Sequence, residues 1–152
     1  MNEDGWRVRK PCTDISIINC KMNGGHGAIV IGSGMSGGVE HIHAADCEIR
    51  NTMQGIRIKS MRGRGGYMAD VTFENIEIKN VTEEAIQVSM VYPYSTVEPK
   101  NPVPPVFDGI MIRNIYGTAG KQAMILRGLE DSHIRNLTLK DIDIKAEMPD
   151  II

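Results

Sequence analysis

Short runs in which apolar and polar residues alternate recur along the whole chain. One six-residue pattern has apolar residues at its first and third positions, Asn or Asp at its fifth, and an apolar residue or Cys at its sixth. Its five copies are residues 15–20 (ISIINC), 42–47 (IHAADC), 71–76 (VTFENI), 110–115 (IMIRNI) and 137–142 (LTLKDI). Alternation with a period of two predicts a β-strand in every copy.

A second alternating run follows each of the first four copies. These runs are residues 28–31 (AIVI), 55–58 (GIRI), 85–88 (AIQV) and 123–126 (AMIL). Each repeat therefore holds two short strands, and the turns between them are too short for crossover helices. No window shows a convincing helical face. The pattern predicts an all-β fold in which about five coils stack as a parallel β-solenoid.

The Asn/Asp position of the repeat distinguishes this fold from the alternative, an antiparallel β-sandwich. The position is occupied by Asn19, Asp46, Asn75, Asn114 and Asp141. Stacked coils bring equivalent residues together in columns about 4.8 Å apart. Asn and Asp tolerate left-handed backbone geometry and bind nearby main chain, so this column is expected to fix a corner of each coil. A sandwich does not explain the column. Cys20 and Cys47 belong to the next column, with Ile76, Ile115 and Ile142, and are expected to point inward.

The chain reads as one domain over residues 1–152 with one long excursion. Residues 90–105 include five prolines, which exclude a central strand, so this segment is expected to leave the solenoid as a loop.

The composition of the chain limits the kinds of binding partner that we expect. A net charge of -2 and an isoelectric point near 6.1 give no field for nucleic acid or an anionic membrane, so neither is expected as a partner. No stretch approaches the roughly 20 apolar residues of a membrane span. The three cysteines lack zinc-site spacing, and we expect no metal and no cofactor.

Basic groups gather on one predicted strand. Arg57 and Lys59 alternate with two isoleucines, so both cations point away from the core on the same side. Aligning the coils by the Asn/Asp column places Arg57 beside Val30 and Lys59 beside Gly32, with His26 earlier in the adjacent coil. Such a pair of cations suits a carboxylate or sulfate.

Glycines surround His26 in this part of the chain. Gly24, Gly25, Gly27 and Gly32 are interpreted as leaving room for a ligand near the backbone. The alternative stays open at this point: the cations are ordinary solvated surface, and the glycines mark turns.

Neighbouring segments offer further candidates. Arg62 and Arg64 lie among glycines and are expected either to clamp an anion or to belong to a flexible loop. Tyr92 and Tyr94 suit either stacking on a sugar ring or anchoring of the proline-rich loop. One member of the pair at positions 83 and 84, both Glu, is a candidate to approach the site from the turn before the run at 85–88.

The motifs themselves resemble a known family. GHG at residues 25–27, IGSGMSGGVEHI at 31–42, GIRIKS at 55–60 and RGRGGYM at 62–68 are similar to glycoside hydrolase family 28, the polygalacturonases. The resemblance implies a right-handed, single-stranded parallel β-helix that hydrolyses α-1,4 links of galacturonan, the acidic polysaccharide of pectin, with inversion. It also implies that His26 is the histidine supporting the catalytic carboxylates. Arg57 and Lys59, with Gly25 and Gly27 nearby, match positions that bind a uronate.

One departure from the family is serious. The Asn-Thr-Asp motif and the Asp-Asp pair that supply the family's catalytic acid and base do not occur in these 152 residues. The resemblance therefore indicates the C-terminal part of a catalytic domain, truncated at the N-terminus and inactive alone, whose parent is expected to be secreted or periplasmic. The alternative is a non-catalytic solenoid module that binds acidic polysaccharide or another chain. A pectate lyase is disfavoured, because no cluster of Asp suits its calcium. An uncovered first coil predicts self-association through the exposed solenoid end.

Overall fold

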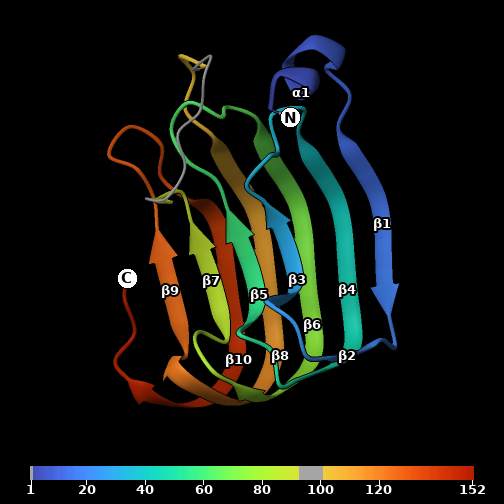
Figure 1. Ribbon diagram of the computed structural model, residues 1–152, viewed down its shortest axis with the longest axis vertical. Helices are drawn as coiled ribbons and strands as arrows, with labels where there is room; N and C mark the ends of the chain where they lie inside the picture. Colours follow the sequence, from blue (N-terminus) through green and yellow to red (C-terminus); the bar gives the residue numbers. More distant parts are fainter. Residues whose placement is uncertain (1, 93–100) are drawn as a thin grey trace.

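The computed structural model describes residues 2–92 and 101–152, with side chains from residue 5 onward, and its strands form two parallel sheets (Figure 1). The longer sheet is ordered β1 (Cys12–Ile18), β4 (Val39–Arg50), β6 (Tyr67–Val81), β8 (Val106–Gln122) and β10 (Arg135–Met148). The short β2 (Lys21–Asn23) also pairs with β4. The shorter sheet is ordered β3 (Gly27–Gly32), β5 (Gln54–Lys59), β7 (Ile86–Ser89) and β9 (Met124–Arg127).

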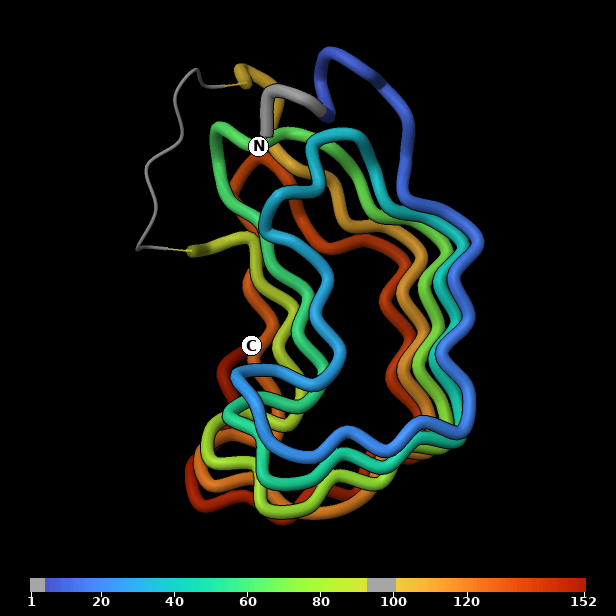
Figure 2. The backbone as a smooth tube through the Cα atoms, turned by 45° about the vertical axis from the view of Figure 1, so that its right-hand side comes forward, coloured from blue at the N-terminus to red at the C-terminus, as the bar shows by residue number. Residues whose placement is uncertain are grey.

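Successive repeats superimpose as the coils of a solenoid (Figure 2). Each strand pairs in parallel with its equivalent one repeat later, for example Ile42 with Val71 and Val71 with Ile110. The prediction of a right-handed parallel β-helix is confirmed, and the sandwich is excluded. The stack makes about four turns, because the fifth repeat adds β10 and then one bridge, from Ile125 to Ile151.

One helix was not anticipated. Helix α1 (Asn2–Val8) precedes the first coil, and the indole nitrogen of Trp6 donates a 2.9 Å hydrogen bond to the carbonyl oxygen of Arg64. Seven residues are too few for the 3.6-residue period to stand out, so the sequence pattern missed it. Among the described residues no helix is long and apolar enough to cross a membrane.

Alternate residues of the facing strands fill the interior. Phe73, Phe107, Ile58 and Ile86 have no exposed surface, and Cys47 is 4% exposed, as its column predicted. Burial of each large side chain contributes about 1.5 to 3 kcal/mol, so this continuous apolar column is the main stabilising element.

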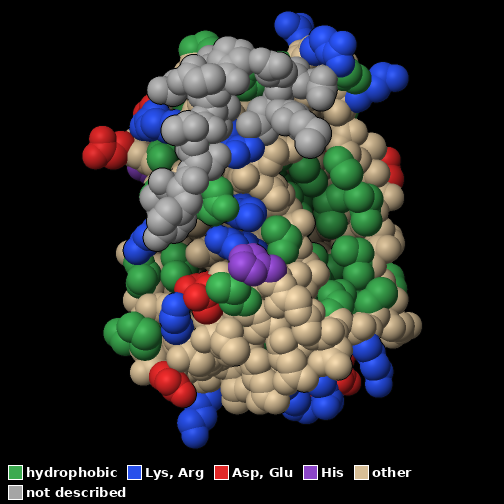
Figure 3. All heavy atoms as spheres, viewed as in Figure 1, with side chains coloured by type: hydrophobic (Ala, Val, Ile, Leu, Met, Phe, Trp, Pro, Cys, Tyr) green, Lys and Arg blue, Asp and Glu red, His purple; other side chains and the backbone are tan. Residues whose placement is uncertain are grey.

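The first coil leaves part of this apolar interior uncovered. Ile15, Ile29, Ile31 and Met35 are among the residues lining a cavity of about 450 Å³ between β1 and β3. Hydrophobic side chains gather on the right of the view in Figure 3, over this part of the molecule. No strand of the described chain pairs with the outer edge of β1 or β3.

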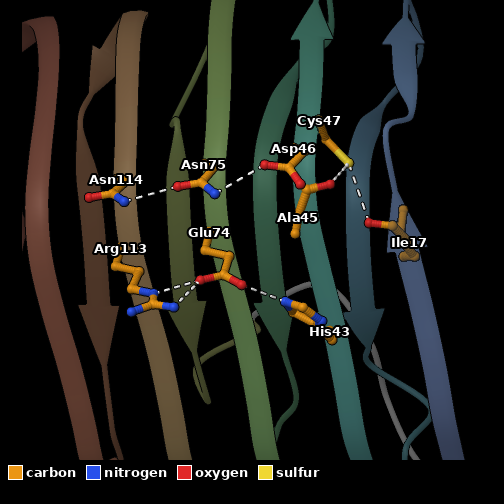
Figure 4. Close-up of polar contacts among 9 residues, drawn as sticks. All are labelled: Ile17, His43, Ala45, Asp46, Cys47, Glu74, Asn75, Arg113 and Asn114. Carbon is orange, nitrogen blue, oxygen red and sulfur yellow. Dashed lines mark hydrogen bonds and ion pairs between the residues drawn. The ribbon is translucent and has the colours of Figure 1, made fainter.

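The corners of the coils are built from residues in left-handed geometry. Asn19, Asp46, Asn75, Asn114 and Asp141 all have φ between 52° and 55°. Their amides form a ladder: Asn75 Nδ2 donates to Asp46 Oδ1 at 3.0 Å, and Asn114 Nδ2 donates to Asn75 Oδ1 at 2.9 Å (Figure 4). The predicted corner column is therefore confirmed.

A second ladder crosses the same strands. His43 Nε2 lies 2.7 Å from Glu74 Oε1, and Arg113 Nε donates to Glu74 Oε2 at 2.6 Å (Figure 4). His43 and then Arg113 hold the pKa of Glu74 below its usual range.

The proline-rich excursion falls partly outside the described residues, namely at 93–100. At its far end the backbone N–H of Asn101 donates to the carbonyl of Gly63 at 2.8 Å. The loop assignment for 90–105 and the single domain over 1–152 stay predictions.

Candidate functional site

The candidate site lies on the outer face of the shorter sheet. Arg57 pairs in register with Val30 on one side and Gln87 on the other, and Lys59 pairs with Gly32 and Ser89. Strand geometry then places both cations on the same outward face. A group of lysine, arginine and histidine side chains is visible over this sheet in Figure 3. The registers expected from the repeat alignment are those observed.

Two glutamines hold the guanidinium of Arg57. Its Nε donates to Gln87 Oε1 at 2.5 Å, and its Nη1 donates to Gln54 Oε1 at 3.2 Å. Both acceptors are neutral amides, so they fix the orientation of the guanidinium without cancelling its charge. The Nη2 donors have no partner among the described residues.

Lys59 lies beside an aromatic ring. Its ammonium is 4.9 Å from the centre of the Tyr92 ring, within the range of a cation–π interaction. Burial, followed by repulsion from Arg57 and Arg64, lowers the pKa of Lys59.

Neither cation is neutralised by a carboxylate of the described chain, although many other basic residues are. Lys21, Lys79, Arg113 and Lys121 each form an ion pair with a glutamate. Two adjacent cations without a carboxylate partner, one with unused donors, are a candidate site for an anion.

A cavity of about 250 Å³ opens at these residues. Its lining includes Arg57, Lys59, Tyr92, Gln87, Ser89, Glu84 and Arg127. Gln87 and Ser89 occupy the positions of Arg57 and Lys59 one coil later, and Arg127 occupies the Lys59 position two coils later. Sequence reasoning overlooked these three, although aligning the runs at 55–58, 85–88 and 123–126 would have placed them in the same columns.

His26 lies in the turn before β3 and is exposed. Its carbonyl oxygen accepts a 3.1 Å hydrogen bond from the backbone N–H of Gln54, the residue whose side chain holds Arg57. Gln54 thus connects the backbone at His26, through its own N–H, with the guanidinium of Arg57, through its side chain.

The glycines around His26 have different structural roles. Gly25 has φ +110°, and a side chain there would meet nothing within 4 Å, so its backbone is open. A Cβ on Gly27 would lie 2.6 Å from the Val30 side chain. A Cβ on Gly32 would lie 1.9 Å from the carbonyl oxygen of Lys59. The expectation that Gly32 leaves room for a ligand is therefore wrong: this glycine lets two coils pack together.

The two adjacent glutamates also differ. Glu83 accepts from Gln54 at 2.5 Å and pairs with Lys121 at 2.9 Å, so it supports the residue that holds Arg57. Glu84 is 8% exposed and lines the cavity, and its Oε2 has no hydrogen-bond partner among the described residues. Of these two glutamates, Glu84 is therefore the one whose side chain lines the candidate site.

The remaining candidate residues lie away from this cavity or fall outside the described residues. Arg62 binds Asp131 through two hydrogen bonds of 2.8 and 2.7 Å, so it ties two loops together. Tyr94 falls outside the described residues. No group of three His, Cys, Asp or Glu side chains in the described part of the chain is arranged to hold a metal.

Fold and site together define a class of protein: a parallel β-helix with a cavity lined by two cations, a candidate anion site, on one sheet. The family model for glycosyl hydrolases family 28 matches residues 3–151, and the chain belongs to that family.

Individual relatives agree with this assignment. The chain is 29% identical over 134 residues to a polygalacturonase of Cochliobolus carbonum, covering 84% of this chain and 36% of the relative. It is also 29% identical to a probable polygalacturonase of Arabidopsis thaliana, and that match covers 97% of this chain and 34% of the relative. The chain thus spans about a third of the length of the curated relatives it matches.

Two solved structures share the architecture. The hyperthermoactive exopolygalacturonase of Thermotoga maritima superimposes with a TM-score of 0.80 at 27% identity, over 97% of this chain and 36% of the other. The family 28 exopolygalacturonase of Yersinia enterocolitica shows the common fold, with a TM-score of 0.57 at 18% identity. This match covers 88% of this chain and 30% of the other.

Proposed function

We propose that this chain provides the uronate-binding half of a polygalacturonase-type active site acting on galacturonan. The observation that carries the proposal is the pair Arg57 and Lys59: adjacent, outward-facing and without a carboxylate partner in the described chain. Family membership supports the substrate class, because the named relatives are polygalacturonases. A polymer of sugar acids supplies the carboxylate that these cations lack.

The geometry supports a division of labour within the site. Arg57, held by Gln54 and Gln87, presents its remaining N–H donors to the substrate carboxylate. Lys59 adds a second positive charge, and Tyr92 packs beside it as a surface for a sugar ring. The open backbone at Gly25 and the absence of a side chain at Gly27, where β3 begins, are proposed to let the sugar approach His26.

His26 is proposed to assist the catalytic carboxylates without replacing them. Inverting hydrolysis requires one carboxylic acid to protonate the leaving oxygen and one carboxylate to activate water. The family's motifs for these groups are absent from these 152 residues. We therefore expect binding of oligogalacturonate by this chain without release of new reducing ends.

The test compares two arginine variants by calorimetric titration with trigalacturonate. Arg57→Ala should weaken binding about tenfold or more, since a hydrogen bond to a charged group contributes about 1.5 to 3 kcal/mol. Arg113→Ala, which removes an arginine paired with Glu74 on the other sheet, should leave binding unchanged. Added salt should weaken binding by the unmodified chain. Equal binding by both variants would contradict the proposal.

The second candidate function is a non-catalytic solenoid that binds another chain. The apolar cavity between β1 and β3 favours it, because Ile15 and Val30 there are 38% and 42% exposed. Self-association through this end predicts a mass that rises with concentration in sedimentation equilibrium and falls in Val30→Lys. A concentration-independent monomer would exclude self-association through this end.

A further inference from the structure

Two cysteines occupy equivalent places in neighbouring coils. Lys21 pairs with Glu48, and the backbone N–H of Glu48 donates to the carbonyl of Cys20 at 2.9 Å. Cys20 therefore stacks directly beside Cys47. Neighbouring strands lie about 4.8 Å apart, which falls within the Cα separations of about 4.4 to 6.8 Å found in disulfides.

The two thiols also make equivalent hydrogen bonds. Cys20 Sγ donates to the carbonyl of Ile18 at 3.5 Å, and Cys47 Sγ donates to the carbonyl of Ala45 at 3.1 Å, in each case two residues back. Cys47 Sγ also lies 3.4 Å from the carbonyl oxygen of Ile17, in the first coil (Figure 4). The Cys47 sulfur thus leans toward the coil that carries Cys20.

Access differs between the two thiols. Both line an open cavity of about 510 Å³ along the Asn/Asp corner, where Cys20 is half-buried and Cys47 is buried. Burial raises the pKa of the Cys47 thiol, and hydrogen bonding and repulsion involving Cys20 also affect it. On the far side Cys47 stacks on Ile76, so Cys20 is its cysteine neighbour within the ladder.

We propose that Cys20 and Cys47 form a disulfide that links the first coil to the second under oxidising conditions. With a small disulfide such as oxidised glutathione as the oxidant, the Cys20 thiolate attacks one sulfur, forms a mixed disulfide and releases one glutathione thiolate. Cys47, after losing its proton, attacks the Cys20 sulfur and releases the second. The two protons end on the released glutathiones, so one disulfide is reduced as one forms.

The link would act on the least covered part of the solenoid. It would close a loop of residues 20–47, which contains His26, and would join the first coil to the second. A cross-link of this kind stabilises mainly by restricting the unfolded chain. The inference rests on the cysteine geometry and is independent of the proposed carbohydrate binding.

The experiment treats the folded chain with oxidised glutathione and maps its peptides by mass spectrometry without reduction. We expect a Cys20–Cys47 linked peptide, loss of two of the three titratable thiols, and a higher urea midpoint that reduction reverses. Cys12→Ser is the matched control, because Cys12 pairs with Val39 and has no cysteine beside it in the ladder. This variant should form the same link.

Two further variants separate the steps. Cys47→Ser should trap Cys20 as its glutathione mixed disulfide, and Cys20→Ser should abolish the increase in urea midpoint. Cys20 remaining as a mixed disulfide in the unmodified chain, a link that requires Cys12, or retention of all three thiols would each overturn the proposal.

Discussion

The ammonium of Lys59 and the ring of Tyr92 are 4.9 Å apart, although Tyr92 follows β7 in the next coil. The Arg57 guanidinium carbon lies 5.9 Å from the centre of the same ring. One aromatic side chain thus lies beside both cations of the candidate site. Its electron-rich face stabilises them where no carboxylate of the described chain does.

Tyr92 is therefore expected to contribute to ligand affinity through its ring. Tyr92→Ala should weaken trigalacturonate binding severalfold in calorimetric titration, because the cations lose a wall of their cavity. Tyr92→Phe should bind almost as well as the unmodified chain, since the ring remains. Equal losses in both variants would assign the contribution to the hydroxyl group instead.

The lowered pKa of Lys59 predicts that anion binding weakens at high pH. Burial and the neighbouring arginines lower its pKa, so the ammonium loses its charge at a lower pH than an exposed lysine does. Binding should weaken as pH rises through this lowered pKa. Lys59→Arg should extend binding to higher pH, because a guanidinium keeps its proton.

The same shift has a consequence for stability. Because the folded-state pKa of Lys59 is below the unfolded value, its charged form costs stability, and that cost is relieved as pH rises through the folded pKa. Urea unfolding at several pH values, compared with Lys59→Met, checks the sign. A Lys59→Met benefit that grows with rising pH would contradict it.

Substitutions in the Asn/Asp corner column can separate the energetic cost of backbone strain from the cost of lost hydrogen bonds. Asn75 has φ 54° and bonds to both Asp46 and Asn114. Asn75→Ala should lower the free energy of unfolding by about 2 to 3 kcal/mol, from left-handed strain and two lost bonds. Asn75→Gly loses the bonds without the side-chain strain and should cost less in urea denaturation. An equal or greater cost for glycine would show that strain is not the main term.

Two glycines with positive φ provide a second matched pair. Gly32→Ala places a methyl group 1.9 Å from the carbonyl oxygen of Lys59, whereas Gly25→Ala meets open space. Strain alone should cost about 1 to 2 kcal/mol in Gly25→Ala. Gly32→Ala adds a clash between coils and should give a clearly lower thermal midpoint by circular dichroism. Similar midpoints for both variants would argue against the packing role of Gly32.

The local sequence was sufficient to predict how the coils stack. Alternation and the Asn/Asp position predicted the parallel solenoid, the left-handed corners and the registers of Arg57 with Val30 and of Lys59 with Gly32. These features repeat in every coil and depend on residues close in sequence, so a pattern reveals them.

Tertiary structure decided what surrounds each repeated position. Gly25 and Gly32 look alike in the sequence, yet one faces open space and the other faces the carbonyl of Lys59, because their neighbours come from a different coil. Likewise, Gln87 meets Arg57 only through stacking, and Tyr92 meets it only through the path of the chain after β7. The sequence by itself determined the coil and its periodic columns. The stacked structure determined which cations stay unpaired, because many ion pairs join side chains of neighbouring coils, as Lys121 and Glu83 do across 38 residues of sequence.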